Sequence, residues 1–138
     1  MKYLRAHRAV ARRLVAGLLA VILGAVGSLA RHYLSAGIYG LKGGSFPYGI
    51  LVVNVLGGFA MGLIVELGAL KLSYSPEMRA LLTTGLLGGF TTFSTFSLDA
   101  ALLMERGDWF GTAAYIVGSV ALSIGALFFG LWLVRSFA

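Results

Sequence analysis

Five hydroxyl side chains occupy seven consecutive positions, from Thr91 to Ser97, in a part of the chain that is otherwise apolar. They belong to the stretch GGFTTFSTFSLDA, which begins at Gly88 and ends at Ala100. Hydroxyls in a membrane helix can bond back to their own backbone carbonyls. So many in one segment instead favour a polar lining, or a helix break whose freed backbone groups they help to satisfy. The two glycines that open the stretch weaken a helix at this point.

Phe93 and Phe96 stand three positions apart, so they are neighbours on one helical face. Lipid contact and core packing are the ordinary uses of such a pair. The functional alternative is that the positive edges of the rings face an anion. The spacing alone does not decide between these interpretations.

A second stripe of donors follows at Tyr115, Ser119 and Ser123, where a spacing of four residues places one phenol and two hydroxyls on one helical face. This stripe indicates either a track of hydrogen-bond donors through the membrane or contacts that hold helices together. Asn54 adds an amide with two N–H donors to an apolar run. Arg31 and Asp99 are ionisable residues in or near apolar segments, and such residues are functional candidates.

Neither a nucleophile–base arrangement nor a phosphate loop stands out in the sequence, and the two histidines do not pair with carboxylates at ligand spacing. The chain has no cysteine, so disulfides and thiolate metal sites are excluded. We therefore expect no enzyme. Neutral hydroxyl and amide donors suit the passage of a small anion that must not bind too tightly.

The elements that must position these donors are transmembrane helices. Hydrophobic residues make up 59% of the 138 residues and charged residues only 12%, which indicates an all-α integral membrane protein. A basic tail, residues 1–13, precedes a channel domain, 14–138, whose four apolar segments each suffice to cross a core of about 30 Å. The expected spans are 14–34, 47–70, 80–104 and 109–134. The third is centred near residue 92, so its expected break lies near the bilayer centre.

The net charge of +6 does not indicate a nucleic-acid partner, because the basic residues flank apolar segments. With four spans, the tail, the second loop and the C-terminus share one side and carry eight basic residues. The opposite side carries Lys42 and Arg106, plus Arg31 if it reaches the interface. This bias places both termini in the cytoplasm. The alternative for the start of the chain is a cleavable export signal, which the continuation of the first span past Ala30 disfavours.

Four ordered segments carry a resemblance that covers nearly the whole chain from about Leu18. They are GAVGSLARHY at 24–33, FPYG at 46–49 followed by NVLGG at 54–58, GGFTTFSTFS at 88–97, and the stripe of Tyr115, Ser119 and Ser123. In these segments the chain resembles the Fluc (CrcB-type) fluoride ion channels of microbes. The resemblance implies a passive, fluoride-selective channel in the cell (inner) membrane, which exports cytoplasmic fluoride and so relieves its toxicity. It also implies a four-helix subunit that pairs with an inverted second subunit in an antiparallel, dual-topology dimer.

The same resemblance implies roles for particular residues. The fluoride pathway would be formed by Asn54, Phe93, Phe96, Tyr115, Ser119 and Ser123. Arg31 and Asp99 would lie near aqueous vestibules, with Asp99 where a glutamate is more usual. The backbone carbonyls of Gly88 and Thr91 would bind a structural Na⁺ at the dimer centre. Ile50 stands where many relatives have a threonine, so one vestibule-side hydroxyl is missing.

The charge bias leaves two assemblies open: an antiparallel homodimer, which the complete set of motifs favours, and a heterodimer with an oppositely biased paralogue. Two rival functions are a small multidrug transporter and a non-transporting structural subunit. A small multidrug transporter has the same helix number but needs a membrane-embedded carboxylate in its first span, and this chain has none there. A non-transporting structural subunit would explain the glycines but not the ordered array of donors.

Overall fold

The computed structural model describes residues 2–42 and 46–138, without the side chains of residues 2–6, 8, 9, 11–13 and 42. Within these residues, the helices that are long and apolar enough to cross a membrane are Leu14–Leu41, Tyr48–Leu72, Pro76–Glu105 and Trp109–Ser136. The prediction of an all-α chain with four spans is therefore confirmed, and the protein is a multi-pass membrane protein.

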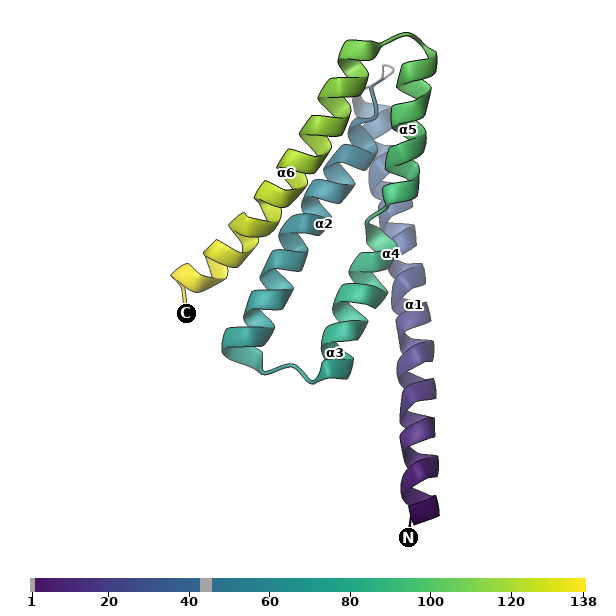
Figure 1. Ribbon diagram of the computed structural model, residues 1–138, viewed down its shortest axis with the longest axis vertical. Coiled ribbons are helices and arrows are strands. Elements are labelled where there is room, and N and C mark those ends of the chain that lie inside the picture. The colour runs from purple at the N-terminus through teal and green to yellow at the C-terminus, as the bar shows by residue number, and fades with distance from the viewer. Residues whose placement is uncertain (1, 43–45) are drawn as a thin grey trace.

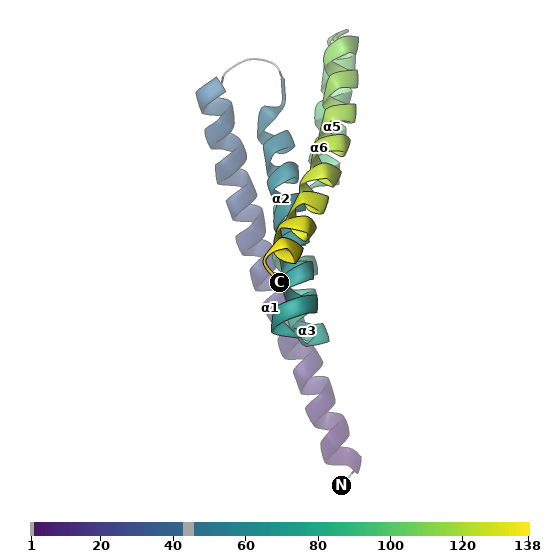
Figure 2. The ribbon, with the colours of Figure 1, turned by 90° about the vertical axis from the view of Figure 1, so that its left-hand side faces the viewer.

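The first helix, α1 (Lys2–Lys42), runs without interruption from the basic tail through the first span. Its apolar part ends at Leu41 rather than near residue 34. At 1.5 Å per residue its 41 residues extend for about 60 Å. The N-terminal part of α1 projects beyond the loop that joins the second and third spans (Figure 1; Figure 2). The described backbone therefore sets no helix boundary between tail and span, while the tail's basic side chains lie outside the described part.

The third span is built from several consecutive pieces. It comprises α3 (Pro76–Ala80), the π-helix η2 (Leu81–Leu87), α4 (Gly88–Phe90) and α5 (Phe93–Glu105). Ser75 caps its start as its sequence position predicts, because its hydroxyl accepts from the Met78 N–H at 3.1 Å. Between α4 and α5, Thr91 and Thr92 have extended backbone angles, with ψ of 159° and 125°.

Gly88 and Gly89, predicted to weaken the helix, lie within the helical turn of α4, just before the extended residues. The reason that position 89 holds a glycine is packing against α1. A Cβ added at Gly89 would lie 2.8 Å from the Cα of Gly24, and one added at Gly27 would lie 2.8 Å from the Phe90 nitrogen. Those distances are too short for real Cβ contacts, so the glycines allow the two backbones to touch.

The fourth span, α6 (Trp109–Ser136), packs along α2 (Tyr48–Leu67), which continues into the π-helix η1 (Gly68–Leu72). Glycines again form the contact. A Cβ added at Gly58 would lie 2.5 Å from the Ser123 carbonyl oxygen, and one added at Gly130 would lie 2.5 Å from that of Phe59. The GxxxG pair of Gly58 and Gly62 in α2 thus packs directly on α6. Both helices start at the end of the molecule where α5 ends, and both run from there in the same direction (Figure 1).

Candidate functional site

A pocket of about 420 Å³ lies between α2, α5 and α6, beside the extended residues of the third span. Its walls include five residues of the predicted pathway: Asn54, Phe93, Phe96, Ser119 and Ser123. These residues come from three different helices and are separated in sequence by up to 69 positions. The fold therefore brings together side chains that the sequence analysis selected separately, and Thr91 and Thr92 line the same space.

The hydroxyls of Ser119 and Ser123 are the most informative polar atoms of this pocket. Both Oγ atoms are buried and have no hydrogen-bond partner among the described residues. Buried polar groups in native proteins are otherwise nearly always paired. Hydroxyls used to hold helices together would have a partner on the neighbouring helix. Among the described residues, neither hydroxyl therefore holds α6 to a neighbouring helix, and both are open to a further acceptor.

The two phenylalanines lie side by side on α5, with ring centroids 5.5 Å apart and an angle of 41° between the ring planes. Phe96 is buried, at 9% exposed, whereas Phe93 is 79% exposed on the surface of the single chain. Phe96 also contacts the Tyr115 ring, at 5.2 Å between centroids. One ring thus belongs to the interior, and the other extends from the pocket to a face that only lipid or a second subunit could cover.

Asn54 fastens α2 to the extended part of the third span. Its Oδ1 accepts from the Thr92 N–H at 2.9 Å, and its Nδ2 donates to the Thr92 carbonyl at 3.1 Å. In a continuous helix the Thr92 N–H would donate to the carbonyl of Gly88, four residues earlier. The amide therefore supplies the acceptor for the Thr92 N–H and keeps one N–H of Asn54 for a further acceptor.

The five hydroxyls from Thr91 to Ser97 do not form one lining. Thr91 Oγ1 donates to the Leu87 carbonyl and Ser97 Oγ to the Phe93 carbonyl, both at 2.9 Å, so these two bond back to their own turn. Thr92 caps α5 by accepting from the Thr95 N–H at 3.2 Å. The cluster thus combines helix capping beside the extended residues with back-bonding elsewhere.

Tyr115 is fully buried, and its hydroxyl donates to Asp99 Oδ2 at 3.2 Å. Tyr115 does not line the pocket but lies behind Phe96. Asp99 lines a second pocket of about 380 Å³, together with Ile50 and Thr95. The vestibule role of Asp99 stays a prediction. Ile50, where the resemblance implies a hydroxyl in many relatives, lines the same pocket.

Arg31 does not line this second pocket with Asp99. Its Nη1 instead donates to the Thr91 carbonyl at 3.4 Å, from α1 across to the third span. The two ionisable residues that the sequence analysis grouped as vestibule residues therefore occupy separate places in the single chain.

No group of three or more His, Cys, Asp or Glu side chains that could hold a metal ion occurs among residues 2–42 and 46–138. A sodium site made of backbone carbonyls is a different case. In a continuous helix the Gly88 carbonyl would accept from the Thr92 N–H, but this N–H donates to Asn54 Oδ1 instead. The Gly88 carbonyl is therefore suited to bind a cation. The Thr91 carbonyl fits less well, because a guanidinium already lies on it and would repel a second cation.

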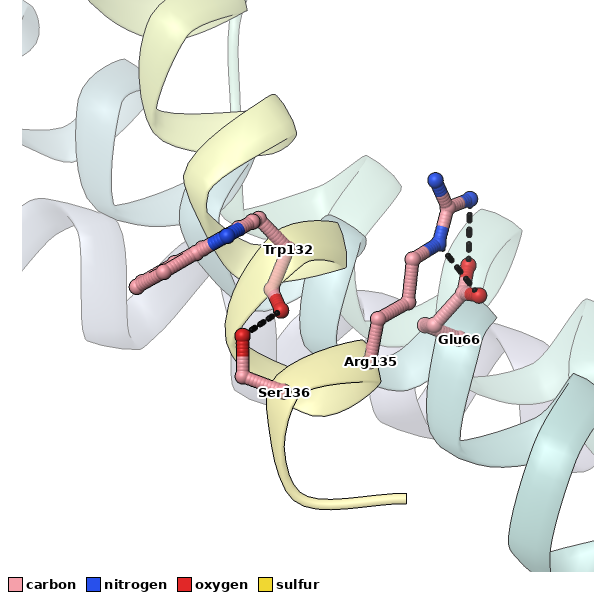
Figure 3. Close-up of polar contacts among 4 residues, drawn as sticks. All are labelled: Glu66, Trp132, Arg135 and Ser136. Atoms are coloured by element: carbon pink, nitrogen blue, oxygen red, sulfur yellow. Dashed lines mark hydrogen bonds and ion pairs between the residues drawn. The ribbon is translucent and has the colours of Figure 1, made fainter.

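An ion pair between Glu66 of α2 and Arg135 of α6 was not predicted from the sequence. The guanidinium binds the carboxylate through two contacts, Nε to Oε1 at 2.8 Å and Nη2 to Oε2 at 3.2 Å (Figure 3). A signal was present: Glu66 and Arg135 have opposite charges near the ends of the second and fourth spans, which leave the membrane on the same side.

Comparisons with known proteins agree with the motifs. The chain matches the family model described as CrcB-like protein, Camphor Resistance (CrcB), over residues 18–131. It is 56% identical over 113 residues to the fluoride-specific ion channel FluC of Chelativorans sp. (strain BNC1), which covers 82% of this chain and 90% of the relative. It is 47% identical over 125 residues to FluC of Rhizobium leguminosarum bv. trifolii (strain WSM2304), which covers 91% of this chain and 100% of the relative. The resemblance seen in the sequence is confirmed, and the chain belongs to the CrcB-like family.

Proposed function

We propose that this protein is a fluoride-specific ion channel, not an enzyme, and that it exports cytoplasmic fluoride passively across the inner membrane. The names of its relatives support fluoride as the transported ion, and the pocket supports passive passage along hydrogen-bond donors. The observation that carries the proposal is the convergence on one pocket of two unpaired serine hydroxyls, an asparagine amide and two phenylalanine rings.

Fluoride is small and strongly hydrated, so a pathway must replace its water with donors of comparable strength. Ser119 and Ser123 can do so at once, because neither hydroxyl has another acceptor among the described residues. The edge of the Phe96 ring adds weak positive potential. These groups carry no formal charge, and this allows the ion to leave again.

Asn54 and Tyr115 have narrower roles in this mechanism. Asn54 holds the extended backbone with one N–H and its carbonyl oxygen, so its second N–H is the donor open to fluoride. The Tyr115 hydroxyl donates a hydrogen bond to Asp99, so it must turn away from Asp99 before it can donate one to the ion. The serines are therefore the first donors, and Tyr115 is a conditional one.

We also propose that the channel is an antiparallel dimer with two fluoride pathways. The exposed Phe93 ring and the small size of the chain support a second subunit on this face. In such a dimer the extended residues Thr91 and Thr92 lie near the bilayer centre, at the middle of the third span. The homodimer is our first choice and a paralogue heterodimer the alternative, because the tail biases insertion.

A structural Na⁺ at the dimer centre would be held by the Gly88 and Thr91 carbonyls. It would supply positive potential near the pathway and keep the two inverted subunits in register. Because Arg31 shares the Thr91 carbonyl in the single chain, we expect this hydrogen bond to be released on dimerisation. The freed Gly88 carbonyl supports the site more strongly than Thr91 does.

The direct test is ion efflux from liposomes reconstituted with the purified chain alone, read with fluoride and chloride electrodes. We expect rapid release of fluoride without release of chloride, which would support both the channel and the homodimer. If a folded dimer releases neither ion, the function is wrong. If the protein alone stays monomeric and inactive but conducts with its paralogue, the function stands and the homodimer does not.

A further inference from the structure

The seam between α2 and α6 reaches directly into the proposed pathway. Gly58 lines the pocket, and its backbone lies against the carbonyl of Ser123, whose hydroxyl is one of the unpaired donors. Asn54, one turn before Gly58, belongs to the same helix. The distance from the amide of Asn54 to the serine hydroxyls is therefore set by how α6 lies on α2.

Glycine contacts permit this close packing, but they do not by themselves fix one register. A Cβ at Gly62 would meet the Leu131 nitrogen at 3.0 Å, and one at Gly130 would meet the Leu63 nitrogen at the same distance. The Phe59 and Phe129 rings also stack across this seam, with 5.7 Å between their centroids. Close contact of small residues supplies van der Waals packing. The ring stack and any directional polar contact between the two helices then add to what fixes their register.

The Glu66–Arg135 ion pair lies at the end of this seam. Glu66 follows Gly62 along α2, and Arg135 follows Gly130 along α6. The Glu66 carboxylate is buried, with its side chain 10% exposed, whereas the Arg135 side chain is 61% exposed (Figure 3). Two contacts from one guanidinium to one carboxylate fix direction as well as distance. Figure 3 shows Arg135 reaching from the last turns of α6 across to α2.

We infer that the Glu66–Arg135 ion pair is a positioning element of the fluoride pathway: it fixes the register of α6 on α2 and thereby places Ser119 and Ser123 opposite Asn54. This inference rests on the proposed function. Neither side chain lines the pocket, so the pair acts only through the helices that carry the donors. The cost of losing it appears in the rate and selectivity of conduction, as well as in folding.

The test compares Glu66→Gln and Arg135→Gln with the parental chain, using fluoride efflux per folded dimer and the ratio of fluoride to chloride release. Arg135→Lys keeps the charge but loses the two-pronged geometry, so it is the milder variant if the others fold poorly. Arg79→Gln is the matched control, because it removes one positive charge on α3, at the loop end of α2, without touching the pair.

A covalent bridge separates position from charge. The chain has no cysteine, so in a Glu66→Cys/Arg135→Cys double variant a bifunctional thiol reagent can react only at these two sites. If the pair positions the helices, the bridge restores conduction although both charges are gone.

We expect Glu66→Gln and Arg135→Gln to lower fluoride efflux per dimer about tenfold, since small displacements of aligned groups have large effects on rate. Arg135→Lys should fall between them and the parental chain, Arg79→Gln should match the parental chain, and the bridge should raise the rate of the double variant. Parental rates and selectivity per dimer in both glutamine variants would overturn the inference, even with fewer folded dimers. Absence of fluoride release from the parental dimer would instead overturn the proposed function, and the inference with it.

Discussion

Replacing Asn54 by leucine removes the side chain that satisfies the backbone of Thr92 in the third span. The Thr92 N–H and the Thr92 carbonyl each lose their hydrogen bond to the amide, at 2.9 and 3.1 Å. Thr92 is 8% exposed, so water has little access to replace these bonds. Each orphaned buried group costs about 1–3 kcal/mol, which gives about 2–6 kcal/mol for the two together.

The assay is equilibrium unfolding of the purified protein in detergent, followed in parallel with fluoride efflux from liposomes. Leu56→Ala is the matched control, because Leu56 is an exposed residue of the same helix. We expect Asn54→Leu to lose both stability and conduction and the control to lose little. A change in unfolding free energy below about 0.5 kcal/mol, the range of ordinary surface substitutions, would refute the view that Asn54 stabilises the extended backbone at Thr92.

Three further predictions concern packing, the rings and the cation. Gly27→Ala should destabilise the protein by about 1–3 kcal/mol in unfolding experiments, because its Cβ would lie 2.8 Å from the Phe90 nitrogen. The control Gly37→Ala, whose Cβ would have nothing within 4 Å, should be neutral or slightly stabilising. Equal effects of the two substitutions would contradict the packing argument. Phe93→Ile and Phe96→Ile should sharply reduce fluoride efflux from liposomes while dimers persist by size-exclusion chromatography, and unchanged efflux in both would remove the rings from the pathway. Replacing Na⁺ by an organic cation should lower the melting temperature of the dimer, and re-addition of Na⁺ but not K⁺ should restore it; a melting temperature independent of Na⁺ would exclude a structural sodium.

The four spans could be predicted because their signal is local. Long apolar segments and a helix start such as Ser75 are properties of neighbouring residues. The exact end of α4 could not be predicted in the same way. Glycine weakens a helix in isolation, but Gly89 contacts the α1 backbone, and only the tertiary structure reveals that use. The extended residues therefore begin at Thr91, after the glycines.

The candidate site divides along the same line. Residues that lie in dense motifs, such as Phe96 and Ser123, could be selected from sequence because their type and spacing are unusual in a membrane segment. The hydrogen bond of Arg31 to Thr91 and the ion pair of Glu66 with Arg135 join positions 60 and 69 residues apart. Sequence spacing carries no information about such contacts unless the directions of the spans are used to bring their ends together.

The basic tail concerns the orientation of the chain in the membrane rather than conduction. The family match begins at residue 18, after all five basic residues of the tail. With the tail, eight basic residues on one side oppose two or three on the other; without those five, three oppose two or three. A chain with so small a bias can insert in both orientations, as an inverted homodimer requires.

Neutralising the basic tail should therefore raise the yield of conducting dimers from this chain alone, measured by size-exclusion chromatography and fluoride efflux. The variant replaces five residues by glutamine: Lys2, Arg5, Arg8, Arg12 and Arg13. A homodimer that forms equally well with and without the charges would mean that the tail does not set orientation. Failure of both forms to dimerise, with rescue by an oppositely biased paralogue, would assign the chain to a heterodimer.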